Sequence, residues 1–139
     1  MIDPLTVKGV SYKLDLSLTA VMAIDIKSLQ WDSLVSGKKL VVADFWAPWC
    51  PYCMRLKPIF ESIANDYTQQ MEFVKVNVDE EPNIASKYGI QGIPVVKFFC
   101  EGKEVGEVVG YVPREVLKRE IDKTASNAPS CLANTSMRK

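Results

Sequence analysis

The sequence contains no histidine and no excess charge of either sign, since 17 lysines and arginines balance 17 aspartates and glutamates. Without histidine, the chain has no His-assisted nucleophile, no Cys/His zinc site and no imidazole acid–base chemistry. Without a basic field or stripe, it has no long-range attraction for polyanions. We therefore expect neither nucleic acid nor an acidic membrane surface as a partner.

Long apolar runs are also missing. No stretch is long and apolar enough to span a bilayer, and residues 1–10 lack the apolar segment of a secretory leader. These absences predict a cytoplasmic protein without a membrane partner, in a compartment that keeps thiols reduced. Cysteine is scarce as well, with four in 139 residues, so a scaffold held together by disulfides is not expected.

The length fits one domain with enough apolar surface to build a core. Residues 10–19 alternate between apolar and polar side chains, which predicts a half-buried extra strand within an N-terminal extension, residues 1–19. Residues 127–139 are mostly small and polar and are expected to form a flexible tail. The domain itself is therefore expected at residues 20–126.

Within that domain, strand-like and helix-like patterns alternate. Near-continuous apolar runs at 40–47, 73–78 and 94–99 predict buried strands, with further strands at 20–26 and 104–109. Helical spacing appears at 31–35, 50–70 and 81–88, and a last helix follows Pro113. This order predicts an α/β fold, a central mixed β-sheet flanked by helices on both faces, with parallel middle strands and a final antiparallel hairpin.

Two closely spaced cysteines, Cys50 and Cys53, follow the strand expected at 40–47 and open the next helix. The thiolate is the nucleophile in disulfide exchange, and the free N–H groups and dipole of a helix N-terminus stabilise it. Cys50 lies at that terminus and is expected to attack, whereas Cys53 lies one turn further in and is expected to resolve the mixed disulfide. A four-thiolate zinc site would also need Cys100 and Cys131, which are single and far apart in the sequence.

The residues around this pair resemble the thioredoxin family over about residues 20–126. The matching segments, in family order, are Asp44-Phe45-Trp46-Ala47, Trp49-Cys50, Pro58, Lys75-Val76-Asn77-Val78-Asp79 and Tyr88-Gly89-Ile90-Gln91-Gly92-Ile93-Pro94, then Gly102 and Gly110. The resemblance implies a thioredoxin fold and a thiol-disulfide oxidoreductase that reduces protein disulfides. It also implies a monomer that a thioredoxin reductase recharges and that needs no bound cofactor, because the Cys50–Cys53 disulfide is the redox centre.

The resemblance further implies roles for two charged residues that interrupt apolar strands. Asp44 is expected to be buried, which would raise its pKa and suit it to accept the proton of Cys53. Lys75 is the expected partner of Asp44 in the catalytic group. The alternative for Lys75 is a side chain on a half-exposed strand whose amino group reaches solvent.

A substrate-binding surface is expected beside the cysteine pair. By resemblance, the Ile93–Pro94 peptide bond is cis and turns backbone groups of Ile93 toward Cys50, where an extended substrate can pair. The alternative is a trans proline that begins a strand. The residues expected to bind substrate are Trp49, Tyr52, Gly92, Ile93, Pro94, Val109 and Gly110.

One departure from the family pattern lies between the cysteines. Thioredoxins usually carry Gly-Pro there, whereas Pro51-Tyr52 makes a Cys-Pro-Tyr-Cys tetrad that resembles the glutaredoxin motif. Two alternatives therefore stay open, namely a glutathione-linked, glutaredoxin-like reductase and a protein that binds an iron–sulfur cluster or zinc between two copies. Of the remaining cysteines, Cys100 is expected to be a small core or near-surface thiol, and Cys131 an exposed free thiol in the tail.

Overall fold

The computed structural model describes residues 23–67, 70–128 and 131. The extra strand predicted within residues 1–19 lies outside this part of the chain, as do residues 132–139 of the predicted tail. Among the described residues, no helix has the length and apolarity needed to cross a membrane. The elements are β3 (Ile24–Asp25), α1 (Ser28–Val35), β4 (Leu40–Trp46), α2 (Pro51–Asp66), β5 (Met71–Asn77), α3 (Pro82–Lys87), β6 (Val95–Cys100), β7 (Lys103–Val109) and α4 (Arg114–Ser126).

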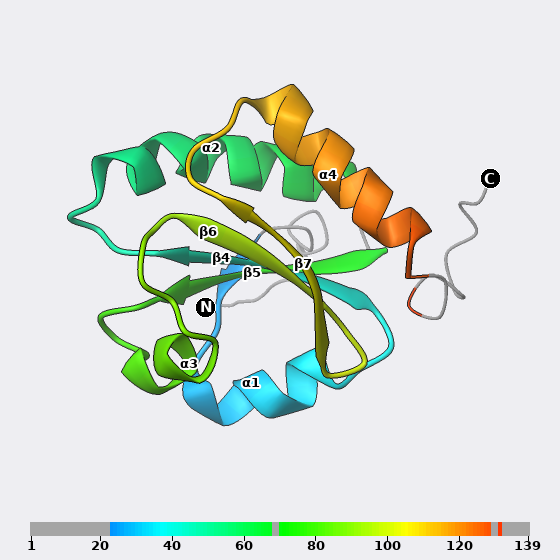
Figure 1. The fold of residues 1–139 in the computed structure, drawn as a ribbon, viewed down its shortest axis with the longest axis horizontal. Helices are drawn as coiled ribbons and strands as arrows, with labels where there is room; N and C mark the ends of the chain where they lie inside the picture. Colours follow the sequence, from blue (N-terminus) through cyan, green and yellow to red (C-terminus); the bar gives the residue numbers. More distant parts are fainter. Residues whose placement is uncertain (1–22, 68–69, 129–130, 132–139) are drawn as a thin grey trace, which may run out of the picture.

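The strands form one five-stranded sheet in the order β3-β5-β4-β6-β7. β3, β5 and β4 run parallel, β6 runs antiparallel to β4, and β7 runs antiparallel to β6. Helices α2 and α4 cover one face of the sheet, and α1 and α3 cover the other (Figure 1). The predicted mixed sheet with helices on both faces is confirmed, including its parallel centre and its antiparallel hairpin.

The position of β4 in the middle of the sheet explains why its residues form a continuous apolar run. Because helices cover both faces, side chains on either side of β4 must be apolar, and the strand reads as a continuous apolar run. Val42 belongs to the core cluster that α2 and α4 cover, and its neighbours Val41 and Ala43 belong to the cluster on the other face. Asp44 follows Val42 by two positions and therefore points toward the α2 face.

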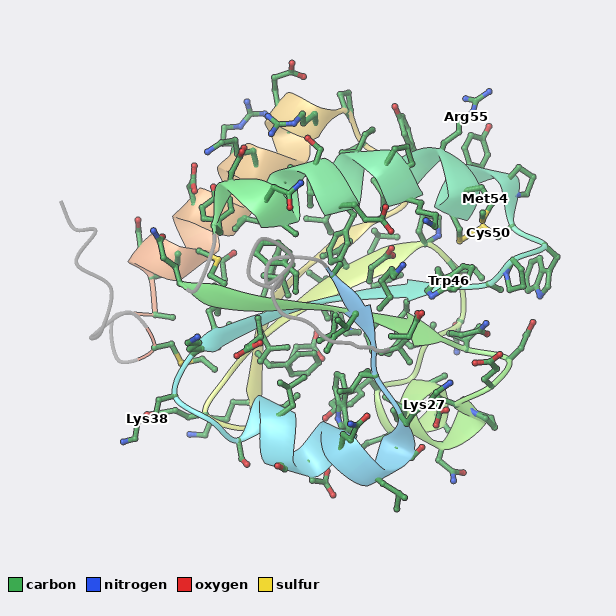
Figure 2. The ribbon with its side chains drawn as sticks, turned by 180° about the vertical axis from the view of Figure 1, so that it is seen from behind. Lys27, Lys38, Trp46, Cys50, Met54 and Arg55 are labelled. Carbon is green, nitrogen blue, oxygen red and sulfur yellow. A yellow bond between two sulfur atoms is a disulfide. The ribbon has the colours of Figure 1, made fainter. Side chains whose placement is uncertain are left out.

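The end of β4 places the cysteine pair. Four residues separate the last residue of β4, Trp46, from the first residue of α2, Pro51, so the pair lies where the carboxyl end of a central strand meets a helix N-terminus. Figure 2 shows Cys50, Met54 and Arg55 together with Trp46 at one end of the molecule, far from Lys38 at the other end. The candidate functional site therefore lies at this end of the sheet.

A second disulfide joins Cys100, at the end of β6, to Cys131, with 5.9 Å between the two Cα atoms. Both residues are buried, and Cys131 belongs to the core cluster under α2 and α4. The prediction of an exposed free thiol at Cys131 is therefore wrong, and Cys100 is buried as expected but oxidised. The physical reason is that the chain turns back after α4. Ala128 is also a core residue, and its carbonyl accepts a hydrogen bond from the N–H of Cys131 at 3.0 Å.

Candidate functional site

The helix α2 begins at Pro51, and Cys50 is its N-cap residue. Proline suits this first helical position because its missing N–H would have no partner inside the helix. Cys50 and Cys53 form a disulfide, with 5.2 Å between their Cα atoms. The backbone N–H of Cys53 donates a hydrogen bond to Sγ of Cys50 at 3.2 Å. After reduction, the same N–H stabilises a thiolate at Cys50, together with the positive end of the helix dipole.

The exposed fractions of the two cysteines do not show which of them attacks. Cys50 is 4% exposed and Cys53 is 1% exposed, so both sulfurs lie under other atoms in the oxidised form. The distinction between them is therefore one of position: the sulfur of Cys50 caps the helix, and Cys53 lies within its first turn. The helix start favours the thiolate of Cys50 over that of Cys53.

Two further loops converge on the pair. The Ile93–Pro94 peptide bond is cis, as expected. The carbonyl oxygen of Ile93 lies 3.8 Å from Sγ of Cys50, within hydrogen-bond reach of a thiol. The carbonyl of Pro94 accepts a hydrogen bond from the N–H of Gly110 at 2.8 Å, which fastens the loop after β7 to the loop before β6. Gly110 has a φ of 87°, a backbone conformation that favours glycine.

Large apolar side chains surround the pair and stay exposed to solvent. Trp49 is 65% exposed, Tyr52 57% and Val109 66%, and Met54 and Tyr111 are exposed as well. We call these five residues the apolar rim. Exposed apolar groups gathered in one place are typical of an interaction surface.

Local contacts hold parts of the apolar rim in place. The indole N–H of Trp49 donates a hydrogen bond to Oδ2 of Asp79 at 2.8 Å, a contact that was not predicted. The rings of Tyr52 and Tyr111 lie 6.5 Å apart between centroids. Of the other residues expected to bind substrate, Gly92 is exposed, Ile93 is half-buried and Pro94 is buried. Rim residues from α2 therefore lie beside residues from the loop after β7.

Asp44 is buried beneath this surface, with 1% of its surface exposed. Burial raises its pKa from the ordinary value of 3.8 to about 7, while the positive charge of Lys75 acts to lower the pKa and the negative charge of Glu61 acts to raise it. One of its carboxylate oxygens, Oδ1, has no hydrogen-bond partner within the described structure. The expected direction of the pKa shift is confirmed. A carboxyl group with a pKa near 7 can accept or return a proton at neutral pH.

Lys75 lies directly opposite Asp44 in the parallel pairing of β4 with β5. It is 8% exposed and lies in a strand of mostly buried residues, so the alternative of a half-exposed strand is wrong. Its ion pair, however, is with Glu61 of α2, at 3.0 Å between Nζ and Oε2. Lys57 of α2 contacts the same oxygen, also at 3.0 Å.

Sequence reasoning identified Lys75 and missed both Glu61 and Lys57. Their spacing of four residues on a predicted helix was a signal, but such pairs usually lie on the outer face and contribute little. The spacing could not indicate that a buried lysine of β5, Lys75, also binds Glu61. No group of three or more acidic or cysteine side chains able to hold a metal ion occurs among the residues that the structure describes.

The geometry agrees with comparisons to known proteins. A family profile described as Thioredoxin matches residues 22–123. This chain belongs to the thioredoxin family. Members of the family are protein-disulfide oxidoreductases that carry a redox-active disulfide and no bound cofactor, and this chain has a disulfide between Cys50 and Cys53 within the matched residues.

Relatives and solved structures support the same family. The chloroplastic M-type thioredoxin of Pisum sativum is 41% identical over 99 residues, which cover 70% of this chain and 58% of the pea protein. Thioredoxin 1 of Synechococcus elongatus is 47% identical over 83 residues, covering 60% of this chain and 78% of that protein. A mutant thioredoxin from Halobacterium salinarum superposes with a TM-score of 0.65 at 33% identity, covering 76% of this chain and 89% of the other.

Proposed function

We propose that the protein reduces disulfides in other proteins, with Cys50 as the attacking thiolate and Cys53 as the resolving thiol. Cys50 attacks one sulfur of the target, the target S–S bond breaks, and the released target thiolate takes up a proton. Cys53 then loses its proton and attacks Sγ of Cys50, which frees the second target thiolate and closes the Cys50–Cys53 disulfide. Two electrons pass from the dithiol to the target. The observation that carries this assignment is the hydrogen bond from the N–H of Cys53 to Sγ of Cys50 at a helix N-terminus.

Asp44 serves as the proton acceptor for Cys53 in this proposal. It is buried in the strand that leads to the dithiol, and its pKa of about 7 matches a group that must change protonation state near neutral pH. Lys75 acts with it as a buried cation whose charge favours the ionised carboxylate. Both residues thus act in the resolving step rather than in the initial attack.

The substrate is an extended segment of a protein. The cis bond before Pro94 leaves the carbonyl of Ile93 beside Cys50, and an extended chain that pairs with this backbone brings its own cysteine to the same sulfur. The apolar rim then packs against side chains next to the target cysteine. Gly92 and Gly110 lie in the two loops that flank this position and leave room for the backbone of the substrate.

The attacking cysteine can be identified by trapping. Cys53→Ser is expected to accumulate mixed disulfides with protein targets, because Cys50 still attacks and nothing resolves the product. Cys50→Ser is expected to accumulate far fewer. Both variants are tested by non-reducing gels of proteins captured from a cell extract. Equal trapping by the two variants would show that the assignment of Cys50 is wrong.

The electron donor is proposed to be a thioredoxin reductase rather than glutathione. Binding glutathione requires charged groups beside the dithiol to hold the charged ends of the tripeptide. The surroundings of the dithiol are apolar, and the nearby cation of Arg55 lies over the ring of Tyr52, with 5.6 Å between its guanidinium carbon and the ring centroid. An exposed apolar surface with aromatic residues is typical of contacts between proteins.

Insulin-disulfide reduction tests the donor. We expect efficient turnover with a thioredoxin reductase and NADPH, and poor turnover with glutathione and glutathione reductase. A Tyr52→Ala variant should not gain activity with glutathione, because the substitution adds no charged group beside the dithiol to bind the tripeptide. Efficient catalysis through glutathione alone would instead favour the glutaredoxin-like alternative that the Cys-Pro-Tyr-Cys tetrad raises.

We also propose that the protein works as a monomer in the cytoplasm. Two observations bear on the compartment. Similar proteins include chloroplast thioredoxins, and the Cys100–Cys131 disulfide is of a kind that is rare in the cytoplasm of most organisms. Its burial limits access of cellular reductants and reconciles it with a cytoplasmic location. Alkylation of thiols in intact cells tests for a reducing compartment such as the cytoplasm, since a protein kept there should have Cys50 and Cys53 reduced.

A further inference from the structure

A cluster of four charged side chains lies between the sheet and α2. Asp44 and Lys75 face each other across β4 and β5, but Nζ of Lys75 is bonded to Glu61, at 3.0 Å. The same oxygen of Glu61, Oε2, is 3.0 Å from Nζ of Lys57. The carboxylate of Glu61 therefore contacts two ammonium groups, whereas Oδ1 of the buried Asp44 carboxylate has no hydrogen-bond partner among the residues described.

The charges that surround Asp44 come from two elements. β5 contributes Lys75, and α2 contributes Glu61 together with Lys57, which lies one helical turn earlier. The other partner of Asp44 in the sheet is Val96 of β6, which does not titrate. The core residues of α4 in this layer are apolar, namely Leu117, Ile121 and Ala125. The electrostatic environment of Asp44 is thus set by the position of one ammonium group and by the carboxylate that holds it.

We propose that Glu61 is a positioning residue for the resolving step. By binding Lys75, Glu61 holds the ammonium group away from the carboxyl group of Asp44, and so sets the pH at which Asp44 can accept the proton of Cys53. Lys57 competes with Lys75 for Oε2 of Glu61 and so weakens the ion pair between Glu61 and Lys75. The proposal rests on the proposed role of Asp44 and adds to it the residues that tune it.

The ionisation of Glu61 is consistent with this role. Partial burial acts to raise its pKa, but hydrogen bonds from Lys75 and Lys57 outweigh burial, and the pKa of Glu61 lies below its usual range. Glu61 therefore stays negative through the range in which Asp44 titrates, near pH 7. Its negative charge opposes ionisation of Asp44, and its bond to Lys75 restrains the cation that favours ionisation.

Two substitutions should move the titration of Asp44 in opposite directions. Glu61→Gln removes the anion but keeps the shape, so Lys75 is free to turn toward Asp44, and the pKa of Asp44 should fall by about one unit. Lys57→Gln removes the competing cation, so Glu61 binds Lys75 more firmly and the pKa of Asp44 should rise. Glu72→Gln is the matched control. Glu72 lies on β5, as Lys75 does, but its partner is the exposed Lys39, so no shift in the pKa of Asp44 is expected.

The measurement is the carboxyl ¹³C titration of Asp44 in the reduced protein, followed by the pH dependence of the resolving step in each variant. The midpoint of resolution should move with the titration. A residue with a merely structural role would change stability without producing shifts of opposite sign. An unmoved titration in Glu61→Gln, or shifts of the same sign in the two variants, would overturn the positioning role.

Failure of the underlying function has a different signature. Asp44→Asn removes the proposed proton acceptor, so resolution in that variant should be slow and its pH profile should lose the step near pH 7. If Asp44→Asn resolves normally, the role of Asp44 fails, even where the titration of Asp44 responds to Glu61→Gln as expected. The two results are independent because the first is a rate and the second is a spectroscopic shift.

Discussion

Asp44→Asn should be more stable than the unchanged protein at pH 8, by up to about 4 kcal/mol. Folding buries Asp44 and raises its pKa from 3.8 to about 7. Each unit of difference corresponds to about 1.36 kcal/mol between the two protonation states, so keeping this carboxylate ionised inside the fold costs about 4 kcal/mol. Asparagine has nearly the same shape and carries no charge, and Lys75 keeps its ion pair with Glu61 after the change.

The gain has a defined pH dependence. Below pH 3.8 the carboxyl group is protonated in both the folded and the unfolded chain, so the two proteins should differ little. Between pH 4 and 7 the unfolded chain ionises first, which lowers the stability of the unchanged protein progressively. Above pH 7 both states are ionised, and the difference between the proteins should stay constant.

Urea unfolding of the oxidised proteins at several pH values from 4 to 8.5 measures this difference. Asp32→Asn is a suitable control, because Asp32 forms an exposed pair with Lys87 and such pairs contribute little to stability. Its stability should follow that of the unchanged protein at every pH. If Asp44→Asn has equal or lower stability at pH 8, the carboxylate does not destabilise the fold.

Loss of the Cys100–Cys131 disulfide should lower the free energy of unfolding by about 3–4 kcal/mol. The bridge closes a loop with a sequence separation of 31 residues, and cross-linking a loop of that length restricts the unfolded chain by roughly this amount. The double variant Cys100→Ala/Cys131→Ala removes the bridge without burying a hydroxyl group. Thermal or urea unfolding under oxidising conditions measures the loss, while insulin reduction through Cys50 and Cys53 should be retained.

The other disulfide provides the control. Cys50→Ala/Cys53→Ala removes a bridge with a sequence separation of three, which restricts the unfolded chain much less. This variant should lose activity and keep most of its stability, the reverse of the first variant. Equal stability losses in the two double variants would mean that the length of the closed loop does not determine the effect.

The fold was predictable from the sequence because its main signals are local. β4 and β6 are buried on both faces and read as apolar runs, and the cysteine pair at the start of α2 marks the junction of strand and helix. The raised pKa of Asp44 was predictable as well, since a carboxylate within a run such as Val41, Val42 and Ala43 has no route to solvent.

The parts that could not be predicted depend on contacts between distant segments. Glu61 reads as one of many surface acids until the fold brings Lys75 from the neighbouring strand to it. Cys131 lies in a polar stretch, and its burial depends on a turn after α4 that no pattern indicates. The link between Trp49 and Asp79 spans 30 residues and has no sequence signature either.

The two disulfides lie at opposite ends of β6. The strand starts directly after Pro94, beside Cys50, and ends at Cys100, which is bonded to Cys131. A resin, a surface or a fused domain joined directly after Cys131 would therefore be attached at the end away from the exchanging sulfur. Immobilised in this orientation, the Cys53→Ser variant would present its apolar rim to the solution and would hold target proteins as mixed disulfides until an added reductant releases them.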